Sequence, residues 1–325
     1  MLVLAAAGSL RGGPQPPSSD QDDTAGRPAE RFKVQVKVNM VNVPVTVRRK
    51  EGGFIRGLPQ EAFRIYEDGV LQDISLFAQE GLPAHVAIVL DISGSVNSAW
   101  GTIRHATRSF VEHLHPEDRF SLYTFNTQIR LKMDWGNNTD RVDEVLGSIY
   151  CTGNTKIWDT VWAVSRNAFR GDEDKKAVIM MSDGMDNRSG ISYSDAVEAA
   201  VRSEAAVYIV SKTEALRQMY LYHKRSTADP YEYYRPDDFA RADLALRHLA
   251  EKTGGRVLYP NDFDKLDNIY GEVIEELRNQ YTLGYISNNS VNDGSYRNIE
   301  VRVNAPNASV GARPGYYAPQ DMPAR

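Results

Sequence analysis

Residues 84–95 constrain the fold more than any other stretch, because they join a buried strand to a cluster of oxygen-bearing side chains. The apolar run 86–90 has the length and β-branched content of a strand buried on both faces, as in a parallel sheet. It ends at Asp91, and Ser93 and Ser95 follow at alternate positions. One carboxylate and two hydroxyls suit Mg²⁺, Mn²⁺ or Ca²⁺ better than zinc or copper. The alternative is a strand that merely runs into a serine-rich loop.

The composition is that of a soluble globular protein. With 325 residues, 42% of them hydrophobic and 25% charged, the chain is long enough for two domains. A net charge of −5 gives no reason to expect nucleic acid or an anionic membrane as a partner. The single cysteine, Cys151, excludes an intrachain disulfide and a cysteine-based zinc site, and the six histidines show no HExxH-type spacing.

The first residues resemble the end of a secretory signal. The apolar run 1–7 is far shorter than the roughly 20 residues of a membrane helix, and Ala5-x-Ala7 is typical of a signal cleavage site. We therefore expect residues 1–10 to be a signal remnant, no transmembrane helix, and a secreted, periplasmic or cell-surface protein. Residues 11–31, rich in Gly, Pro, Ser and Asp, are expected to form a disordered linker.

Two segments, 32–83 and 280–318, show the alternation of apolar residues that is typical of antiparallel strands. In the first, the alternation changes phase near Met40, which predicts a bulge or a bend there. Pro44 predicts an edge strand or a position beside that bulge. Neither segment has enough strands for a sandwich of its own, so we expect the two to complete one β-sandwich together. Residues 319–325 are expected to form a tail.

Between them, residues 84–279 alternate between strand and helix patterns. This predicts an α/β domain with a doubly wound, mostly parallel sheet, inserted in the β-sandwich. The expected strands are 86–90, 120–125, 129–135, 177–181, 207–210 and 257–259, and the expected helices are centred on 103–114, 142–149, 157–168, 196–205, 244–250 and 266–277.

Asp183 and Thr155 extend the oxygen cluster. In a doubly wound sheet, ligands bind beyond the carboxyl ends of the strands. Asp183 follows the buried strand 177–181, so it should reach the same edge as Asp91. Thr155 opens a helix after a glycine-containing loop. Taken singly, Thr155 could be a helix cap and Asp183 a turn former.

These three stretches resemble the motifs of the von Willebrand factor type A (vWA) family, a metal-dependent adhesion fold. The family's DxSxS motif matches Asp91-Ile92-Ser93-Gly94-Ser95, and its TDG-type strand end matches Ser182-Asp183-Gly184. Its GGT-type loop matches Gly153-Asn154-Thr155, with Asn in place of the second Gly. The flanking stretches 57–58, 66–69 and 313–317 look like the bacterial branch first noted in Acidobacteria.

The resemblance implies a metal-ion-dependent adhesion site (MIDAS). Ser93, Ser95 and Thr155 would offer hydroxyl oxygens to one divalent ion. Asp91 and Asp183 would bind that ion directly or through water. Because neutral hydroxyls leave the ion electron-poor, it could take an Asp or Glu carboxylate from a protein partner as its last ligand.

Other residues near these motifs have plainer interpretations. Asp186 could support the site, but we interpret it as a solvated loop acid. Cys151 is interpreted as a small buried hydrophobe rather than a reactive thiol. The segment 213–238 is too long and polar for an ordinary loop, and it is rich in the residue types that binding hot spots favour. It is either a surface insertion without a partner or a partner-binding surface formed by Tyr220, Tyr222, Tyr231, Tyr233, Tyr234 and Arg235.

The sequence thus predicts a protein-binding or adhesion module, not an enzyme, with Mg²⁺ (or Mn²⁺ or Ca²⁺) as cofactor. A metal-dependent hydrolase is one alternative, but phosphoryl chemistry on α/β sheets often uses Asp-x-Asp, and Ser93 stands where the second Asp would be. No nucleophile elbow, P-loop or dinucleotide fingerprint occurs in the sequence. A structural or secretion component with a vestigial metal site is the other alternative.

Overall fold

The computed structural model of the chain describes residues 40–79, 82–169, 175–211, 235–260 and 266–320. All of these belong to one compact unit, Val38–Arg325. The expected alternation over residues 32–39, and with it the change of phase before Met40, lies outside the described residues. No described helix is long and apolar enough to span a bilayer.

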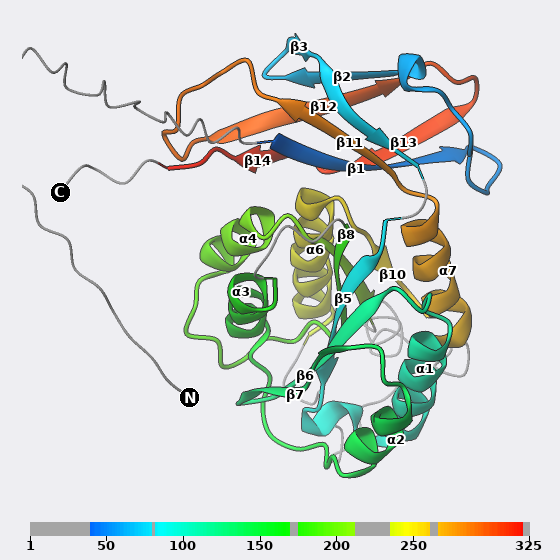
Figure 1. Ribbon diagram of the computed structural model, residues 1–325. Coiled ribbons are helices and arrows are strands. Elements are labelled where there is room, and N and C mark those ends of the chain that lie inside the picture. The colour runs from blue at the N-terminus through cyan, green and yellow to red at the C-terminus, as the bar shows by residue number, and fades with distance from the viewer. Residues whose placement is uncertain (1–39, 80–81, 170–174, 212–234, 261–265, 321–325) are drawn as a thin grey trace, which may run out of the picture. The chain divides into compact units, whose positions relative to one another are not determined.

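A six-stranded sheet forms the centre of the α/β part (Figure 1). Its strand order is β10-β9-β8-β5-β6-β7, and every neighbouring pair is parallel except β6 and β7. The inner strand β5 pairs on both sides, so that Ile88 lies opposite Leu122 and Ile179. This confirms the predicted mostly parallel sheet. The strands are β5 (Ala84–Asp91), β6 (Arg119–Phe125), β7 (Ile129–Gly136), β8 (Lys175–Ser182), β9 (Ala206–Ser211) and β10 (Val257–Leu258).

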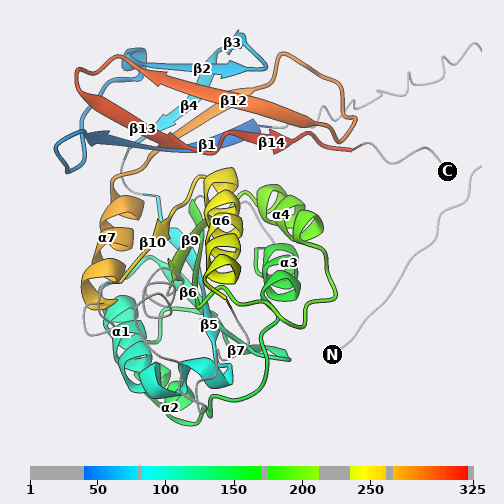
Figure 2. The same ribbon diagram turned by 180° about the vertical axis from the view of Figure 1, so that it is seen from behind.

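Helices cover both faces of this sheet (Figures 1 and 2). Alternate residues of β5 face opposite sides: Val86 and Ile88 pack toward α1, α2 and α7, whereas Ala87 and Val89 pack toward α3, α4 and α6. Burial on both faces explains why β5 has no polar residue between Val86 and Leu90. The helices are α1 (Trp100–Glu112), α2 (Asp140–Gly147), α3 (Ile157–Asn167), α4 (Tyr193–Arg202), α6 (Pro236–Thr253) and α7 (Leu266–Arg278), and the short 3₁₀ helix η2 (Gly94–Ala99) precedes α1.

The two flanking segments form two four-stranded antiparallel sheets. Each sheet takes two strands from before the α/β insert and two from after it, which confirms the predicted shared sandwich. The inward-facing residues Val43, Phe63 and Leu283 are fully buried in its core. One sheet has the order β13 (Ala308–Ala312), β1 (Met40–Arg49), β11 (Tyr281–Ile286), β4 (Ile74–Ala78); the other has the order β14 (Gly315–Tyr317), β12 (Tyr296–Val303), β2 (Phe63–Glu67), β3 (Val70–Gln72).

Two details of the sandwich concern the expected strands. Pro44 is predicted at an edge or beside a bulge; β1 is an inner strand of its sheet, but at Pro44 it is paired on one side only, as at an edge. The fold tolerates the proline because β13 pairs with β1 only over Val45–Arg49, which leaves Pro44 paired with Thr282 of β11. Strand β13 was not predicted at all, because its sequence, ASVGA, is short and consists of small side chains apart from Val310.

A buried polar cluster inside the sandwich connects the segment before the α/β insert to the segment after it. The Glu67 carboxylate accepts hydrogen bonds from the hydroxyls of Tyr285, at 2.7 Å, and Tyr316, at 3.0 Å. Arg297 Nη1 donates to the same carboxylate at 3.2 Å. Gly315 must be a glycine here, because a Cβ atom on it would lie 2.3 Å from the Arg297 carbonyl oxygen. The stretches 66–69 and 313–317 therefore have a structural role.

Candidate functional site

The carboxyl ends of β5 and β8 bring four of the predicted residues together. Asp91 is the last residue of β5, and Asp183 directly follows β8, the parallel neighbour of β5. Ser95 Oγ donates a hydrogen bond to Asp183 Oδ2 at 2.5 Å and lies 3.0 Å from Ser93 Oγ. Asp91 and Asp183 are both 1% exposed. Two carboxylates and two hydroxyls thus meet at one edge of the sheet.

Hydrogen bonds from neighbouring groups hold the carboxylates of Asp91 and Asp183 in position. Asp91 accepts the backbone N–H of Ser93 at 2.8 Å and the hydroxyl of Ser182 at 3.1 Å. Asp183 accepts the backbone N–H of Met185 at 3.1 Å. The sequence motif pointed to Ser182 only as part of a strand end; in the fold, its hydroxyl orients Asp91.

Electrostatics makes this edge receptive to a cation. Burial, and next the nearby charge of Asp183, raise the pKa of Asp91 from 3.8 to about 7, while hydrogen bonds from Ser93 and Ser182 partly oppose the rise. Two buried carboxylates so close together repel each other when both are ionised. A divalent cation bound between them would relieve that repulsion.

Thr155, the fifth predicted residue, lies in a loop tied to the same edge. Thr152 N donates to the Ile92 carbonyl at 2.8 Å, and Gly94 N donates to the Gly153 carbonyl at 3.2 Å. Gly153 has a φ of +86°, which favours glycine. The Thr155 side chain is buried, yet its hydroxyl makes no hydrogen bond to another described residue. It is therefore available to a ligand.

Asn126 is a part of this edge that sequence reasoning missed. It follows β6, its Nδ2 donates to the Thr152 carbonyl at 2.8 Å, and its Oδ1 accepts from Gln128 N at 2.9 Å. It therefore ties the loop that contains Thr155 to a third strand end. Its position directly after a buried strand was the available signal, since Asp183 also directly follows one.

The donor set fits a hard divalent cation. All five predicted side chains present oxygen atoms, as Mg²⁺, Mn²⁺ and Ca²⁺ prefer. Among the described residues, no three His, Cys, Asp or Glu side chains gather in a way that could hold a metal ion. A metal ion at this edge would therefore depend on the serine and threonine hydroxyls. Gly94 and Asn154 are exposed, so that solvent reaches the rim of the cluster.

Asp186 is not a solvated loop acid, and that interpretation is wrong. Its Oδ1 accepts the backbone N–H of Ile157 at 2.7 Å and the hydroxyl of Ser189 at 2.6 Å. It caps the first turn of α3 from another segment of the chain. Nothing in the sequence indicated the contact with Ile157, because it is 29 residues away along the chain.

Cys151 is half-buried and packs against the core beneath α1 and α2. Burial, and next the charge of Asp91, raise the pKa of its thiol to about 11, which is unfavourable for a nucleophile. Of the predicted partner-binding residues, Arg235 is exposed and its backbone N–H donates to Asp238 at the start of α6, at 2.7 Å. The others lie outside the described residues: Tyr220, Tyr222, Tyr231, Tyr233 and Tyr234.

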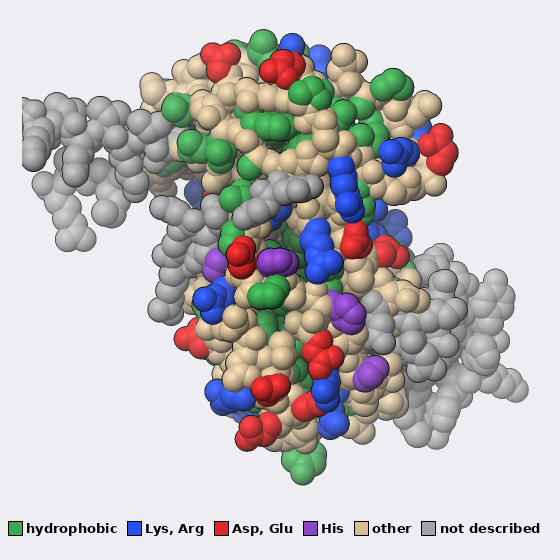
Figure 3. All heavy atoms as spheres, turned by 45° about the vertical axis from the view of Figure 1, so that its right-hand side comes forward, with side chains coloured by type: hydrophobic (Ala, Val, Ile, Leu, Met, Phe, Trp, Pro, Cys, Tyr) green, Lys and Arg blue, Asp and Glu red, His purple; other side chains and the backbone are tan. Residues whose placement is uncertain are grey.

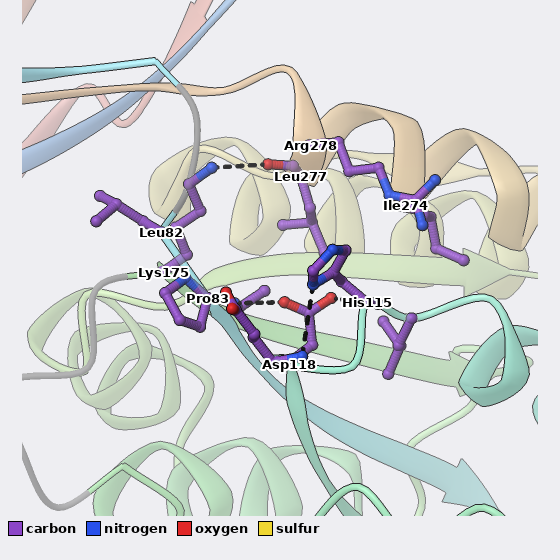
Figure 4. A pocket seen from close by; sticks show the side chains of 11 residues that line it. Leu82, Pro83, His115, Asp118, Lys175, Ile274, Leu277 and Arg278 are labelled. Carbon is purple, nitrogen blue, oxygen red and sulfur yellow. Dashed lines mark hydrogen bonds between the residues drawn. The ribbon is translucent and has the colours of Figure 1, made fainter.

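A pocket of about 190 Å³ lies at the opposite edge of the sheet, where β5 and β8 begin (Figure 4). Lys175 Nζ donates to the Leu277 carbonyl at the end of α7, at 3.2 Å. Asp118 accepts the backbone N–H groups of Ala84 and His115, both at 2.8 Å. These polar groups hold strand starts and helix ends together. On the face drawn in Figure 3, basic and acidic side chains are intermixed.

Solved structures of two other proteins are similar to parts of this chain. Proximal thread matrix protein 1 from the mussel byssus, also solved with a zinc-occupied MIDAS motif, matches 61% of this chain at 15% identity and a TM-score of 0.46. This chain covers 49% of that protein. An aerotolerance-related membrane protein from Bacteroides fragilis, with multiple mutations to serines, matches over 60% of this chain and 100% of its own, at 14% identity and a TM-score of 0.45.

In sequence, no curated protein matches the chain. The model of the von Willebrand factor type A domain matches residues 85–272, which is more than half of the chain. That range contains the central sheet from β5 to β10 and all five predicted site residues. The chain therefore belongs to the von Willebrand factor type A domain family.

Proposed function

We propose that this protein is a divalent-metal-dependent protein-binding module with a MIDAS formed by Asp91, Ser93, Ser95, Thr155 and Asp183. The observation that carries the proposal is the position of Ser95 Oγ, 3.0 Å from Ser93 Oγ and 2.5 Å from Asp183 Oδ2. This contact joins two motifs that are 88 residues apart in sequence. It gathers hard oxygen donors at the edge where α/β folds bind ligands.

The mixture of donors suits recognition of a carboxylate. A divalent cation held here would supply a coordination position open to an oxygen from outside the protein. Three of the five donors are neutral hydroxyls, so the two carboxylates would only just balance its charge. A carboxylate of an Asp or Glu in a protein partner would then be a favourable further ligand, with Mg²⁺ as the proposed ion and Mn²⁺ or Ca²⁺ as alternatives.

We favour binding over catalysis. A phosphoryl-transfer enzyme of this architecture would use a second carboxylate where this chain has Ser93, and Cys151 has a raised pKa that is unfavourable for a nucleophile. We also propose that the protein acts outside the cytoplasm and is related to the bacterial, Acidobacterial-type branch of the family. The second candidate, an assembly component with a vestigial site, is less favoured because the five side chains retain their oxygen donors.

Titration calorimetry of the full chain with Mn²⁺ and Mg²⁺ tests the metal site. Ser93→Ala and Ser95→Ala should each weaken binding at least about tenfold, since each removes a donor. Ser98→Ala is the matched control, because Ser98 is an exposed serine in the same 3₁₀ helix, η2, and should bind as the wild type does. Undiminished Mn²⁺ binding by a folded Asp91→Ala/Ser93→Ala double variant would refute the site.

Partner recognition needs a separate experiment. A random peptide library displayed on phage is selected on the immobilised protein in Mg²⁺. The enriched peptides should contain Asp or Glu, should be released by EDTA, and should not bind Asp91→Ala. Enrichment of peptides that lack a carboxylate side chain and bind equally in EDTA would contradict carboxylate recognition.

A further inference from the structure

We propose that the loop after β8, residues 186–191, sets the position of Thr155, so that Asp186 and Asn187 are positioning residues of the metal site. This inference rests on the proposed function, because Thr155 is one of the five proposed ligands. It concerns residues that act on the Thr155 segment through hydrogen bonds to its backbone.

Asn187 holds both backbone polar groups of Thr155. Its Oδ1 accepts the Thr155 N–H at 3.1 Å, and its own N–H donates to the Thr155 carbonyl at 3.2 Å. These two bonds fix the peptide groups on either side of the Thr155 Cα, which limits where the hydroxyl can go. Loss of the Asn187 side chain removes one of the two bonds.

The same loop caps the helix that follows Thr155. An α-helix leaves its first N–H groups without partners inside the helix, and Lys156, at the N-cap of α3, provides no side-chain cap. Asp186 Oδ1 accepts the Ile157 N–H at 2.7 Å. Ser189 Oγ accepts the N–H groups of Trp158, at 3.0 Å, and Asp159, at 3.2 Å. The start of α3 is thus held by a loop that begins at the end of β8.

A side chain of α3 in turn accepts hydrogen bonds from backbone groups of loop 186–191. Asp159 Oδ1 accepts the N–H groups of Gly190 at 2.7 Å and Ile191 at 2.8 Å, and Lys156 Nζ donates to Oδ2 at 3.0 Å. Although burial alone would raise the pKa of Asp159, these hydrogen bonds lower it overall. Asp159 therefore stays ionised and keeps the far end of loop 186–191 on α3.

The hydrogen bonds between loop 186–191 and residues 155–159, here called the clasp, connect the segment that carries Asp183 to the segment that carries Thr155. Asp183 is at the end of β8, three residues before Asp186, and Thr155 is two residues before α3. On its other side, the Thr155 loop is held to β5 through backbone hydrogen bonds at Thr152 and Gly153. The clasp therefore fixes the distance between a hydroxyl on one segment and a carboxylate on another. Groups that orient metal ligands typically contribute about 10- to 100-fold to metal affinity.

The loop offers a matched control. Arg188 lies between Asn187 and Ser189, is exposed, and makes no hydrogen bond or ion pair to a described residue. Arg188→Ala should therefore change neither the clasp nor the metal site. Asp186→Asn is the conservative variant, because an amide oxygen can still accept the Ile157 N–H.

Calorimetry with Mn²⁺ alone, on the full chain, gives the first measurement. Asn187→Ala and Asp186→Ala should each lower Mn²⁺ affinity by about 10- to 100-fold, whereas Arg188→Ala and Asp186→Asn should stay within about threefold of the wild type. Amide hydrogen exchange in EDTA gives the second measurement and needs no metal. The Thr155 amide should exchange faster in Asn187→Ala, and the Ile157 amide should exchange faster in Asp186→Ala.

The outcomes separate this inference from the function on which it rests. If Asp91→Ala abolishes Mn²⁺ binding but both folded alanine variants bind Mn²⁺ as tightly as the wild type, the clasp is structural only and the inference is wrong. If the wild type binds no Mn²⁺, both the inference and the proposed function fail. The two alanine variants remove different bonds of the same clasp, so either one that folds is a sufficient test.

Discussion

Arg297 of β12 and Glu67 of β2 form an ion pair inside the sandwich, with 3.2 Å between Nη1 and Oε1. Their side chains are 3% and 2% exposed, and 230 residues separate them in sequence. The pair joins the segment before the α/β insert to the segment after it. Because the Tyr285 and Tyr316 hydroxyls also donate to the carboxylate, the buried charge has several partners.

We expect Glu67→Ala to destabilise the protein by about 3–5 kcal/mol, because it leaves Arg297 buried without its counter-charge. Urea unfolding, followed by circular dichroism, measures the loss. Glu300→Ala is the control: Glu300 lies on β12 and pairs with Arg302 at 2.6 Å, but both side chains are more than half exposed. It should leave stability almost unchanged. Equal losses for the two variants would show that burial of the pair has no consequence.

Asp91 should make the metal-free protein less stable as the pH rises. The pKa of Asp91 is about 7 in the folded protein, compared with 3.8 for an unperturbed Asp side chain. Between these two pH values, the folded protein therefore keeps a proton that the unfolded chain releases. The resulting stabilisation is complete below about pH 4 and is lost as the pH rises to about 7. In EDTA, the melting temperature of Asp91→Asn should fall less over this interval, and the variant should be the more stable protein above about pH 7.

Mg²⁺ provides the complementary test. At a pH above about 7, it should raise the melting temperature of the wild type and leave that of Asp91→Asn unchanged. The same pH dependence for both proteins in EDTA would contradict the assigned cause, since the difference between them is a single titrating carboxyl.

Gly255 and Gly271 should respond in opposite ways to the same substitution. A Cβ atom on Gly255 would lie 2.1 Å from the Val207 carbonyl oxygen, whereas one on Gly271, inside α7, would meet nothing within 4 Å. We expect Gly255→Ala to cost about 3 kcal/mol or more, because backbone must move. Gly271→Ala should stabilise the protein by about 0.5–1 kcal/mol, since alanine restricts the unfolded chain. Urea unfolding of both variants checks the signs.

Cys151 should react slowly with thiol reagents. Its pKa of about 11 leaves a thiolate fraction at neutral pH that is about 100-fold below that of an unperturbed thiol. The rate with Ellman's reagent should be correspondingly low in the native protein and normal in denaturant. Because Asp91 contributes to the shift, Asp91→Asn should react faster than the wild type. A native rate equal to the denatured rate would contradict this account.

The residues that sequence reasoning found share a local signal. Asp91 and Asp183 follow strands that are buried on both faces, and such strands are readable as unbroken apolar runs. The shared sandwich was also predictable, because each flanking segment by itself lacked partners for its alternating strands. In these cases the information lies within a few neighbouring residues.

What the sequence did not reveal depends on contacts between distant segments. Asp186, Asn187 and Asn126 act on backbone groups of another loop, and a side chain's partner is not encoded next to it. Helix α6 begins at Pro236, several residues before the expected helix, because its first turn is charged and gives no apolar period. That β1 becomes an inner strand beyond Pro44 also depends on a distant segment, because β13 pairs with it only over Val45–Arg49.

The interleaving of the sandwich strands has a consequence for synthesis on the ribosome. Strands β1 and β4 are made first, but their partner β11 begins only at Tyr281, after the whole α/β insert. The insert contains every strand of its own sheet and can fold while the chain is still growing. Until it has been translated, the N-terminal strands keep unpaired edges and the apolar face of Val43 and Val45 exposed. A pause of the ribosome within the insert would prolong this exposure. A chaperone that binds nascent chains would then find in β1 an exposed apolar segment to bind.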